Sequence, residues 1–124
     1  MPYVYDRLVA ANPFHLDSFL ARPLTARVAT SGPTVRQAWF LWEDGAFWIL
    51  TGPWARLLAR VEADPVIALV VDVCDLATGL VRQVIARGAA EILPFDAPRG
   101  RRKLTRYLGA DESKWDSRFR RCLL

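Results

Sequence analysis

The stretch from Gln37 to Pro65, QAWFLWEDGAFWILTGPWARLLARVEADP, constrains the fold of this chain most strongly. Asp44-Gly45 lies between two apolar runs and favours a tight turn, because Gly tolerates a positive φ and Asp can bond its own backbone. The pattern predicts a β-hairpin. Thr51 and a Gly-Pro loop then lead into a helix expected at roughly residues 53–63, with Arg56 in an early turn. A hydroxyl, a guanidinium and the free N–H groups of a helix start together suit a phosphate.

Length and composition favour one small domain. The 124 residues are enough for a single core, and a hydrophobic content of 52% excludes a disordered or fibrous chain. No run approaches the roughly 20 apolar residues of a membrane helix, and the N-terminal residues lack the features of a secretory signal. We therefore expect a cytoplasmic protein with no membrane partner. Cys74 and Cys122 have no second pair of metal ligands nearby, which predicts reduced thiols and no metal site.

The net charge of +4 is concentrated near the C-terminus. Residues 96–121 hold nine Arg or Lys residues against four acids. A basic segment of this kind can contact phosphates, but its charges are spread over two predicted helices without an evident groove-reading element. We therefore do not expect nucleic acid as a partner. An interaction module that binds a partner through these basic C-terminal helices stays open as one of three functional alternatives.

The remaining patterns predict a mainly β fold with flanking helices. Beyond a short helix within residues 13–21, we expect a five-stranded meander, with strands at residues 24–32, 35–42, 46–51, 66–74 and 80–92. The run VIALVVDVC at 66–74 is the most strand-like and should be central. Strands that are apolar on both faces fit a closed or nearly closed barrel with something packed outside it. Gly88 is expected at a bulge or bend.

The pattern becomes helical after Asp96. Leu104, Tyr107 and Leu108 recur at helical spacing, and Gly109 is placed to end that helix. A second helix is expected over residues 111–121, with Trp115, Phe119 and Cys122 on one side.

The order of these elements resembles the pyridoxamine 5′-phosphate oxidase-like family, the flavin-binding split barrels. The resemblance rests on LTARVATSG, on RQAWFLWEDGAFWILT, on the Thr-loop-Arg helix ending in ADP, and on VIALVVDV and VRQVIARGAAEI. It implies a split β-barrel of antiparallel strands in a single domain over residues 1–124, with a barrel core at about 22–95 and C-terminal helices at about 97–121. It also implies a homodimer that binds FMN, or in some branches a deazaflavin coenzyme, at the subunit interface.

The resemblance assigns the cofactor phosphate to the loop and helix after the hairpin. Thr51 and Arg56 match the phosphate-binding pair, and Trp54 falls in the loop over that group. Relatives commonly carry Lys and, three residues later, Asn on this helix, where this chain has Leu57 and Arg60. Arg60 lies one turn from Arg56, so both guanidinium groups can face one anion, although both also suit a solvated helix surface.

Three further positions are assigned to the ring region of the cofactor. Gln37 and Trp39 match positions that run alongside the isoalloxazine ring, and Arg27 is expected to point toward the ring or the phosphate. Two alternatives stay open, because Trp39 also fits a core position and Arg27 a surface position.

The implied function is an oxidoreductase in which the flavin transfers hydride to or from an unknown small molecule. A flavin-binding protein without turnover is the second alternative. No catalytic acid or base stands out, since Glu43-Asp44 and the pair Asp72 and Asp75 are explained as turn residues. Many relatives continue into a further barrel strand where this sequence stops at residue 124. Replacement of that strand, helix packing in its place and truncation all stay open.

Overall fold

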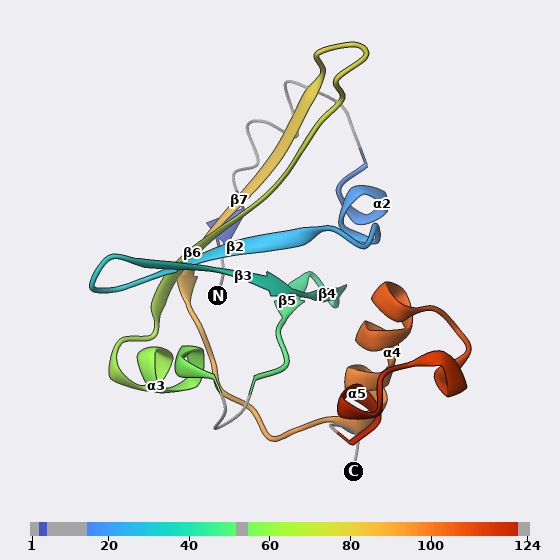
Figure 1. Ribbon diagram of the computed structural model, residues 1–124. Coiled ribbons are helices and arrows are strands. Elements are labelled where there is room, and N and C mark those ends of the chain that lie inside the picture. The colour runs from blue at the N-terminus through green and yellow to red at the C-terminus, as the bar shows by residue number, and fades with distance from the viewer. Residues whose placement is uncertain (1–2, 5–14, 52–54, 122–124) are drawn as a thin grey trace.

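The computed structural model describes residues 3–4, 15–51 and 55–121 (Figure 1). The first half of the chain contains β1 (Tyr3–Val4), α2 (Leu16–Leu20), β2 (Thr25–Thr30), β3 (Thr34–Trp39), β4 (Leu41–Glu43) and β5 (Ala46–Trp48). The second half contains α3 (Arg56–Ala63), β6 (Val66–Cys74), β7 (Val81–Ala89), α4 (Ala97–Leu108), the 3-10 helix η1 (Glu112–Lys114) and α5 (Ser117–Arg121). Among these described residues, no helix is both long and apolar enough to cross a membrane.

The strands form a five-stranded antiparallel sheet in the order β1-β7-β6-β2-β3 and a separate hairpin of β4 and β5. The prediction of a central strand at 66–74 is confirmed, because β6 pairs with β7 on one edge and β2 on the other. The prediction of a simple five-strand meander is wrong. In a meander, β2 would be an edge strand with β3 as its one neighbour. In the structure, β2 pairs with β3 on one edge and with β6 on the other, so this buried strand has its hydrogen-bonding groups paired on both edges. The two sheets do not close on each other, so the fold is an approximate split barrel.

The expected strand at 35–42 is divided at Phe40 into β3 and β4. The cause lies far along the chain, because the Phe40 amide donates to the Tyr107 hydroxyl at 3.1 Å. The expected strand at 46–51 pairs only over Ala46–Trp48. Between these strands the predicted turn is confirmed, with positive φ at both Asp44 and Gly45.

The predicted helix over 111–121 is wrong as a single element. Asp111 accepts a hydrogen bond from the Ser113 amide and starts η1, whereas Asp116 accepts one from the Arg118 amide and starts a separate helix, α5. These Asp side chains compete with a continuous helix, as short polar side chains often do. Cys122 lies outside the described residues, so its predicted position on this helix is not described.

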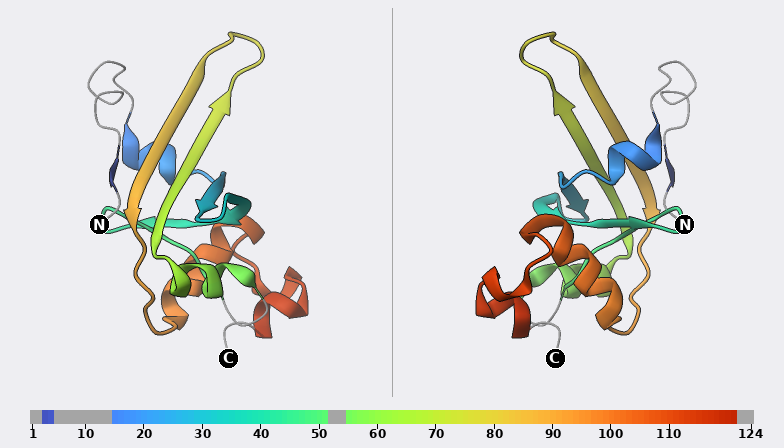
Figure 2. Two further views of the ribbon diagram at one scale, coloured as in Figure 1. Left: turned by 90° about the vertical axis from the view of Figure 1, so that its left-hand side faces the viewer. Right: turned by 90° about the vertical axis from the view of Figure 1, so that its right-hand side faces the viewer.

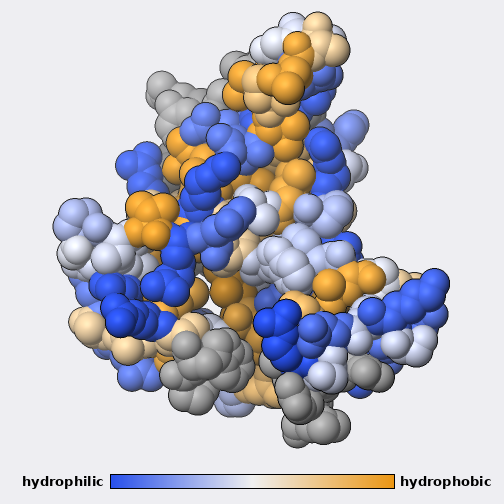
Figure 3. All heavy atoms as spheres, viewed as in Figure 1, coloured by the Kyte–Doolittle hydropathy of each residue, from blue (hydrophilic) through white to orange (hydrophobic). Residues whose placement is uncertain are grey.

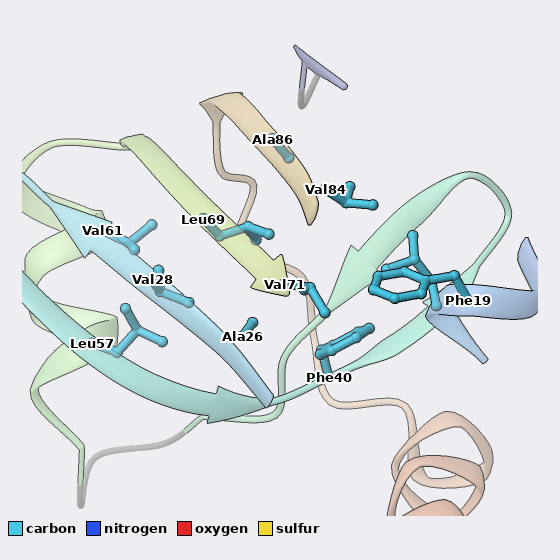
Figure 4. Packing of buried hydrophobic residues seen from close by; sticks show 11 residues of the cluster. Phe19, Ala26, Val28, Phe40, Leu57, Val61, Leu69, Val71, Val84 and Ala86 are labelled. Atoms are coloured by element: carbon cyan, nitrogen blue, oxygen red, sulfur yellow. The ribbon is translucent and has the colours of Figure 1, made fainter. Parts of the chain in front are cut away.

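The hydrophobic core lies on one face of the large sheet, called here the inner face (Figure 4). Alternation along the strands places Val28, Leu69 and Ala86 on this face, and α3 covers it with Leu57 and Val61. Phe19 and Leu20 of α2 and Phe40 complete the core. Complete burial of a large apolar side chain contributes roughly 1.5–3 kcal/mol, so this packing fixes α3 against the sheet.

Helix α4 is attached to the end of α2 and to the segment that follows it. Gly109, with a φ of 95°, ends this helix as the sequence predicts, and the Asp96 side chain caps its start. The Arg106 guanidinium donates to the carbonyl groups of Leu20 and Arg22.

In both views of Figure 2, the helices α3, α4 and α5 gather at one end of the molecule and the β6–β7 hairpin projects from the other.

Candidate functional site

The first part of the candidate site is the start of α3. Leu57 and Val61 are buried, Arg56 is exposed, and Arg60, next to Val61 in the sequence, is half-buried. The residue before the helix, Ala55, has no side chain that could cap the first N–H groups. A helix start in this state favours an anion, because its free N–H groups carry partial positive charge.

Two orphaned polar atoms belong to the residues predicted to bind phosphate. Among the described residues, the buried side-chain atoms without a hydrogen-bond partner are Thr51 Oγ1, Arg60 Nε and Arg106 Nε. A buried polar group left unpaired costs roughly 1–3 kcal/mol, and such groups in a native structure call for an explanation. A hydroxyl and a guanidinium can both donate to phosphate oxygens, so Thr51 and Arg60 fit the implied group. Trp54 lies outside the described residues.

The second group of predicted residues lies on the opposite, outer face of the sheet. Arg27 and Gln37 are directly opposite each other in the β2–β3 pairing. The Arg27 guanidinium donates to the Asp72 carboxylate at 2.6 Å, and the Gln37 amide donates to Thr25 Oγ1 at 3.3 Å. Both residues are exposed.

Trp39 also belongs to the outer face, but helices cover it. Its ring stacks on Tyr107 of α4 with centroids 4.6 Å apart, and on Phe119 of α5 at 5.6 Å. The structure therefore brings Thr51, Arg56 and Arg60 to the inner side of the sheet and leaves Arg27, Gln37 and Trp39 on the other.

A cavity of about 870 Å³ lies on the inner side. Its walls are the inner face of the sheet, the β4–β5 hairpin, α3, the segment after β7, and α4. Of the predicted site residues that the structure describes, Thr51 lines this cavity, and the rest of the lining is largely apolar. Figure 3 shows hydrophobic side chains in the hollow between the α3 and α4 sides of the molecule. Cavities of roughly 300–1,000 Å³ commonly hold small molecules.

Sequence reasoning missed Lys103, which lines this cavity and is only 7% exposed. It is one of the nine basic residues at 96–121, whose charges the sequence analysis spreads over two predicted helices. A signal was present, because Gly100, Lys103, Leu104 and Tyr107 recur at the i, i+3, i+4 spacing of one helix face. Lysine is rarely buried without a specific interaction.

Glu43 joins the hairpin to α4 at the edge of the cavity. Its carboxylate accepts from Arg102 Nε at 2.6 Å and from Arg99 Nε at 3.0 Å, and the Arg99 guanidinium lies 3.5 Å from the Trp48 ring centroid. The hydrogen bond from Arg102, opposed by burial and assisted by Arg99, lowers the pKa of Glu43 to about 2. Glu43 is therefore ionised at neutral pH and holds α4 in place.

In the described part of the chain, no group of three or more His, Cys, Asp or Glu side chains could hold a metal ion.

Comparison with known proteins identifies the family. Residues 14–121 match the sequence model of the family described as pyridoxamine 5′-phosphate oxidase. The chain belongs to this family. No curated protein matches the chain in sequence.

Two solved structures are similar to this chain in fold. A conserved hypothetical protein from Mycobacterium tuberculosis superposes with a TM-score of 0.71 at 20% identity, covering 87% of this chain and 71% of that one. An F420 reductase superposes with a TM-score of 0.63 at 25% identity, covering 79% of this chain and 80% of that one. The predicted split-barrel fold class and the predicted family are both confirmed.

Proposed function

We propose that this family member is an oxidoreductase that binds FMN or a deazaflavin and acts by hydride transfer on a small molecule. The observation that carries the proposal is the pair of orphaned atoms, Thr51 Oγ1 and Arg60 Nε, beside an uncapped helix start. The family match supports a flavin, and the similarity to an F420 reductase supports a deazaflavin as the second candidate.

The residues after the hairpin would hold the cofactor phosphate. The Thr51 hydroxyl and the Arg60 guanidinium would each gain a missing hydrogen bond, and Arg56 would add a second positive charge from the same helix. The bound cofactor would supply the redox chemistry, and the protein would position it and exclude water. This assignment explains why two polar atoms are buried without hydrogen-bond partners among the described residues.

The ring of the cofactor would lie against a second protomer. The sheet separates Arg27, Gln37 and Trp39 from the residues proposed to bind the phosphate. One cofactor would contact both groups if the outer face of one protomer met the α3 side of its partner. We therefore propose a homodimer with the cofactor at its interface.

Titration of FMN and of F420 against the purified protein tests the phosphate site. Arg56→Ala and Arg60→Ala should each weaken binding about ten- to a hundredfold, because each removes a charge-assisted contact of roughly 1.5–3 kcal/mol. Thr51→Ala should weaken it less. None of these changes should lower the stability of the protein without cofactor by more than about 0.5–1 kcal/mol.

Arg101→Ala is the matched control, because Arg101 is an exposed arginine of α4 that pairs with Glu112 away from α3. It should leave cofactor affinity unchanged. Unchanged affinity in both Arg56→Ala and an Arg56/Arg60 double substitution would remove the phosphate site from α3. If the cofactor binds, reduction of the complex by NAD(P)H or by a deazaflavin-reducing system would then separate turnover from binding alone.

A further inference from the structure

We propose that the cavity on the inner side of the sheet binds a neutral, largely apolar small molecule in the gap where the two sheets do not close. The proposal rests on the position of the cavity and on the charges in its walls, and it does not depend on the proposed function. Arg56 and Arg60, the cations proposed for the cofactor phosphate, lie outside the cavity lining, although Thr51 belongs to it.

The cavity lies along the edges of strands. Its lining contains every residue of two stretches, 46–51 and 86–96. A cavity against the face of a strand would meet alternate residues, because successive side chains point to opposite faces. Contact with consecutive residues therefore places the cavity beside the edge of β5 and beside the chain that continues from β7. Among the described strands, β5 pairs with β4 alone, so the other edge of β5 is left for this gap.

The walls of the gap suit an apolar molecule. Val28 and Leu69 of the sheet, Leu58 of α3 and Phe47 of the hairpin all contribute to the lining. Contact between these side chains and an apolar ligand removes apolar surface of both from water, which is favourable in proportion to the area buried. A volume of about 870 Å³ and a place in the opening of a barrel are both common for small-molecule sites.

Charged groups in the described lining are engaged within the protein or exposed. The Arg99 guanidinium lies 3.0 Å from a Glu43 carboxylate oxygen and 3.3 Å from one of Asp44. Lys103 is buried and already has an interaction within the protein. The other charged lining residues are exposed, namely Arg87, Glu91 and Asp96. An ionic ligand would lose its water here without meeting a buried, unengaged counter-charge, which is costly, so the ligand that fits is neutral.

An apolar rim gives this ligand an entry path. Ile92, Leu93 and Phe95 follow β7, line the cavity, and are each about half exposed, at 49%, 50% and 50%. A ligand that enters past them covers apolar surface that is otherwise in contact with water.

The test compares two fluorescent probes that share one ring system. N-phenyl-1-naphthylamine is neutral, and 8-anilino-1-naphthalenesulfonate adds a sulfonate to the same skeleton. The neutral probe should bind saturably, as a single molecule per chain, with an increase in emission. The sulfonate should bind about tenfold more weakly, because its charge would have to leave water.

Leu58→Trp, at a half-buried wall position, should weaken binding of the neutral probe about tenfold, because the added bulk occupies part of the cavity. Leu76→Trp is the matched control, since Leu76 is 94% exposed and lies outside the cavity lining. It should leave the affinity unchanged.

Phe95→Ala keeps the proposal testable if Leu58→Trp fails to fold by circular dichroism. It shortens a half-exposed side chain of the rim and should weaken the neutral probe about fivefold. Leu80→Ala is its matched control, because Leu80 is 48% exposed and lies outside the cavity lining.

Four results would overturn the proposal. These are no saturable binding of the neutral probe, equal or tighter binding of the sulfonate, and native affinity in the folded cavity variants. The fourth is displacement of the neutral probe by stoichiometric FMN or F420, which would make the cavity part of the cofactor site. Binding of the neutral probe by a protein that binds neither cofactor would support this inference and contradict the proposed function.

Discussion

At the scale of single residues, Glu43 shows how a surface acid becomes part of the framework. It accepts hydrogen bonds from Arg102 and Arg99, and its pKa falls from an ordinary value of 4.5 to about 2. A carboxyl group with a lowered pKa in the folded state stabilises the fold above its unfolded pKa. That contribution is lost as the pH falls from about 4.5 through about 2.

We expect Glu43→Gln to destabilise the protein by about 1 kcal/mol at pH 7, because these ion pairs are partly solvated. The difference between variant and native protein should shrink as the pH is lowered from 4.5 to about 2. Urea unfolding at a series of pH values measures it. Glu62→Gln, at an exposed position of α3, is the control and should change stability little. A Glu43→Gln penalty that stays constant down to pH 2 would contradict the assigned role.

At the scale of elements, Tyr107 joins α4 to the strands. Its hydroxyl accepts from the Phe40 amide at 3.1 Å and donates to the Leu24 carbonyl at 2.5 Å. Burial raises the pKa of Tyr107, so the hydroxyl keeps its proton at neutral pH and can donate. The same side chain stacks on Trp39, which makes one residue responsible for both the strand break and the cover over β3.

Tyr107→Phe should lower stability by about 1–3 kcal/mol, because the Phe40 amide and the Leu24 carbonyl lose their partner while the ring stack is kept. Thermal unfolding followed by tryptophan fluorescence measures the loss. Ser113→Ala deletes an exposed hydroxyl that bonds Asp111, and as the control it should cost no more than about 0.5 kcal/mol. Equal unfolding temperatures for Tyr107→Phe and native protein would show that the Tyr107 hydrogen bonds do not stabilise the fold.

At the scale of the whole molecule, the outer face of the sheet carries exposed valines beside charged residues. Strand alternation places Val35, Val66 and Val81 on this face, with exposures of 69%, 62% and 59%. Arg27 and Gln37 share the face. These valines are spread along the face, because Val66 and Val81 lie at opposite ends of the β6–β7 pairing. Together with the many aromatic residues of a small barrel, they support the proposed homodimer.

We expect sedimentation velocity at micromolar concentration to show a dimer. A Val35→Lys/Val81→Lys double substitution should shift the protein toward monomer, because it buries charge at the proposed interface. Ala110→Lys, at an exposed position between α4 and η1, is the control and should leave the dimer intact. A native protein that stays monomeric throughout this range would contradict both the homodimer and a cofactor shared between protomers.

Features set by neighbouring residues could be predicted from the sequence. The Asp44-Gly45 turn, the strand at 66–74 and the helix end at Gly109 all appear where the sequence places them. Each depends on interactions within a few positions along the chain, such as the hydrogen bond from the Gly109 amide to the Thr105 carbonyl. The family resemblance follows from the order of these local elements.

Tertiary structure alone decided the features that depend on distant residues. The break at Phe40 requires Tyr107, 67 positions away, and the β2–β6 pairing requires strands separated by the whole hairpin and α3. Burial of Lys103 depends on how α4 packs across the cavity. The sequence alone did not show that Thr51 Oγ1 and Arg60 Nε are buried without a described partner, nor that the sheet separates the predicted site residues. The burial of an atom and the face of the sheet on which a side chain lies depend on which surfaces meet when the chain folds.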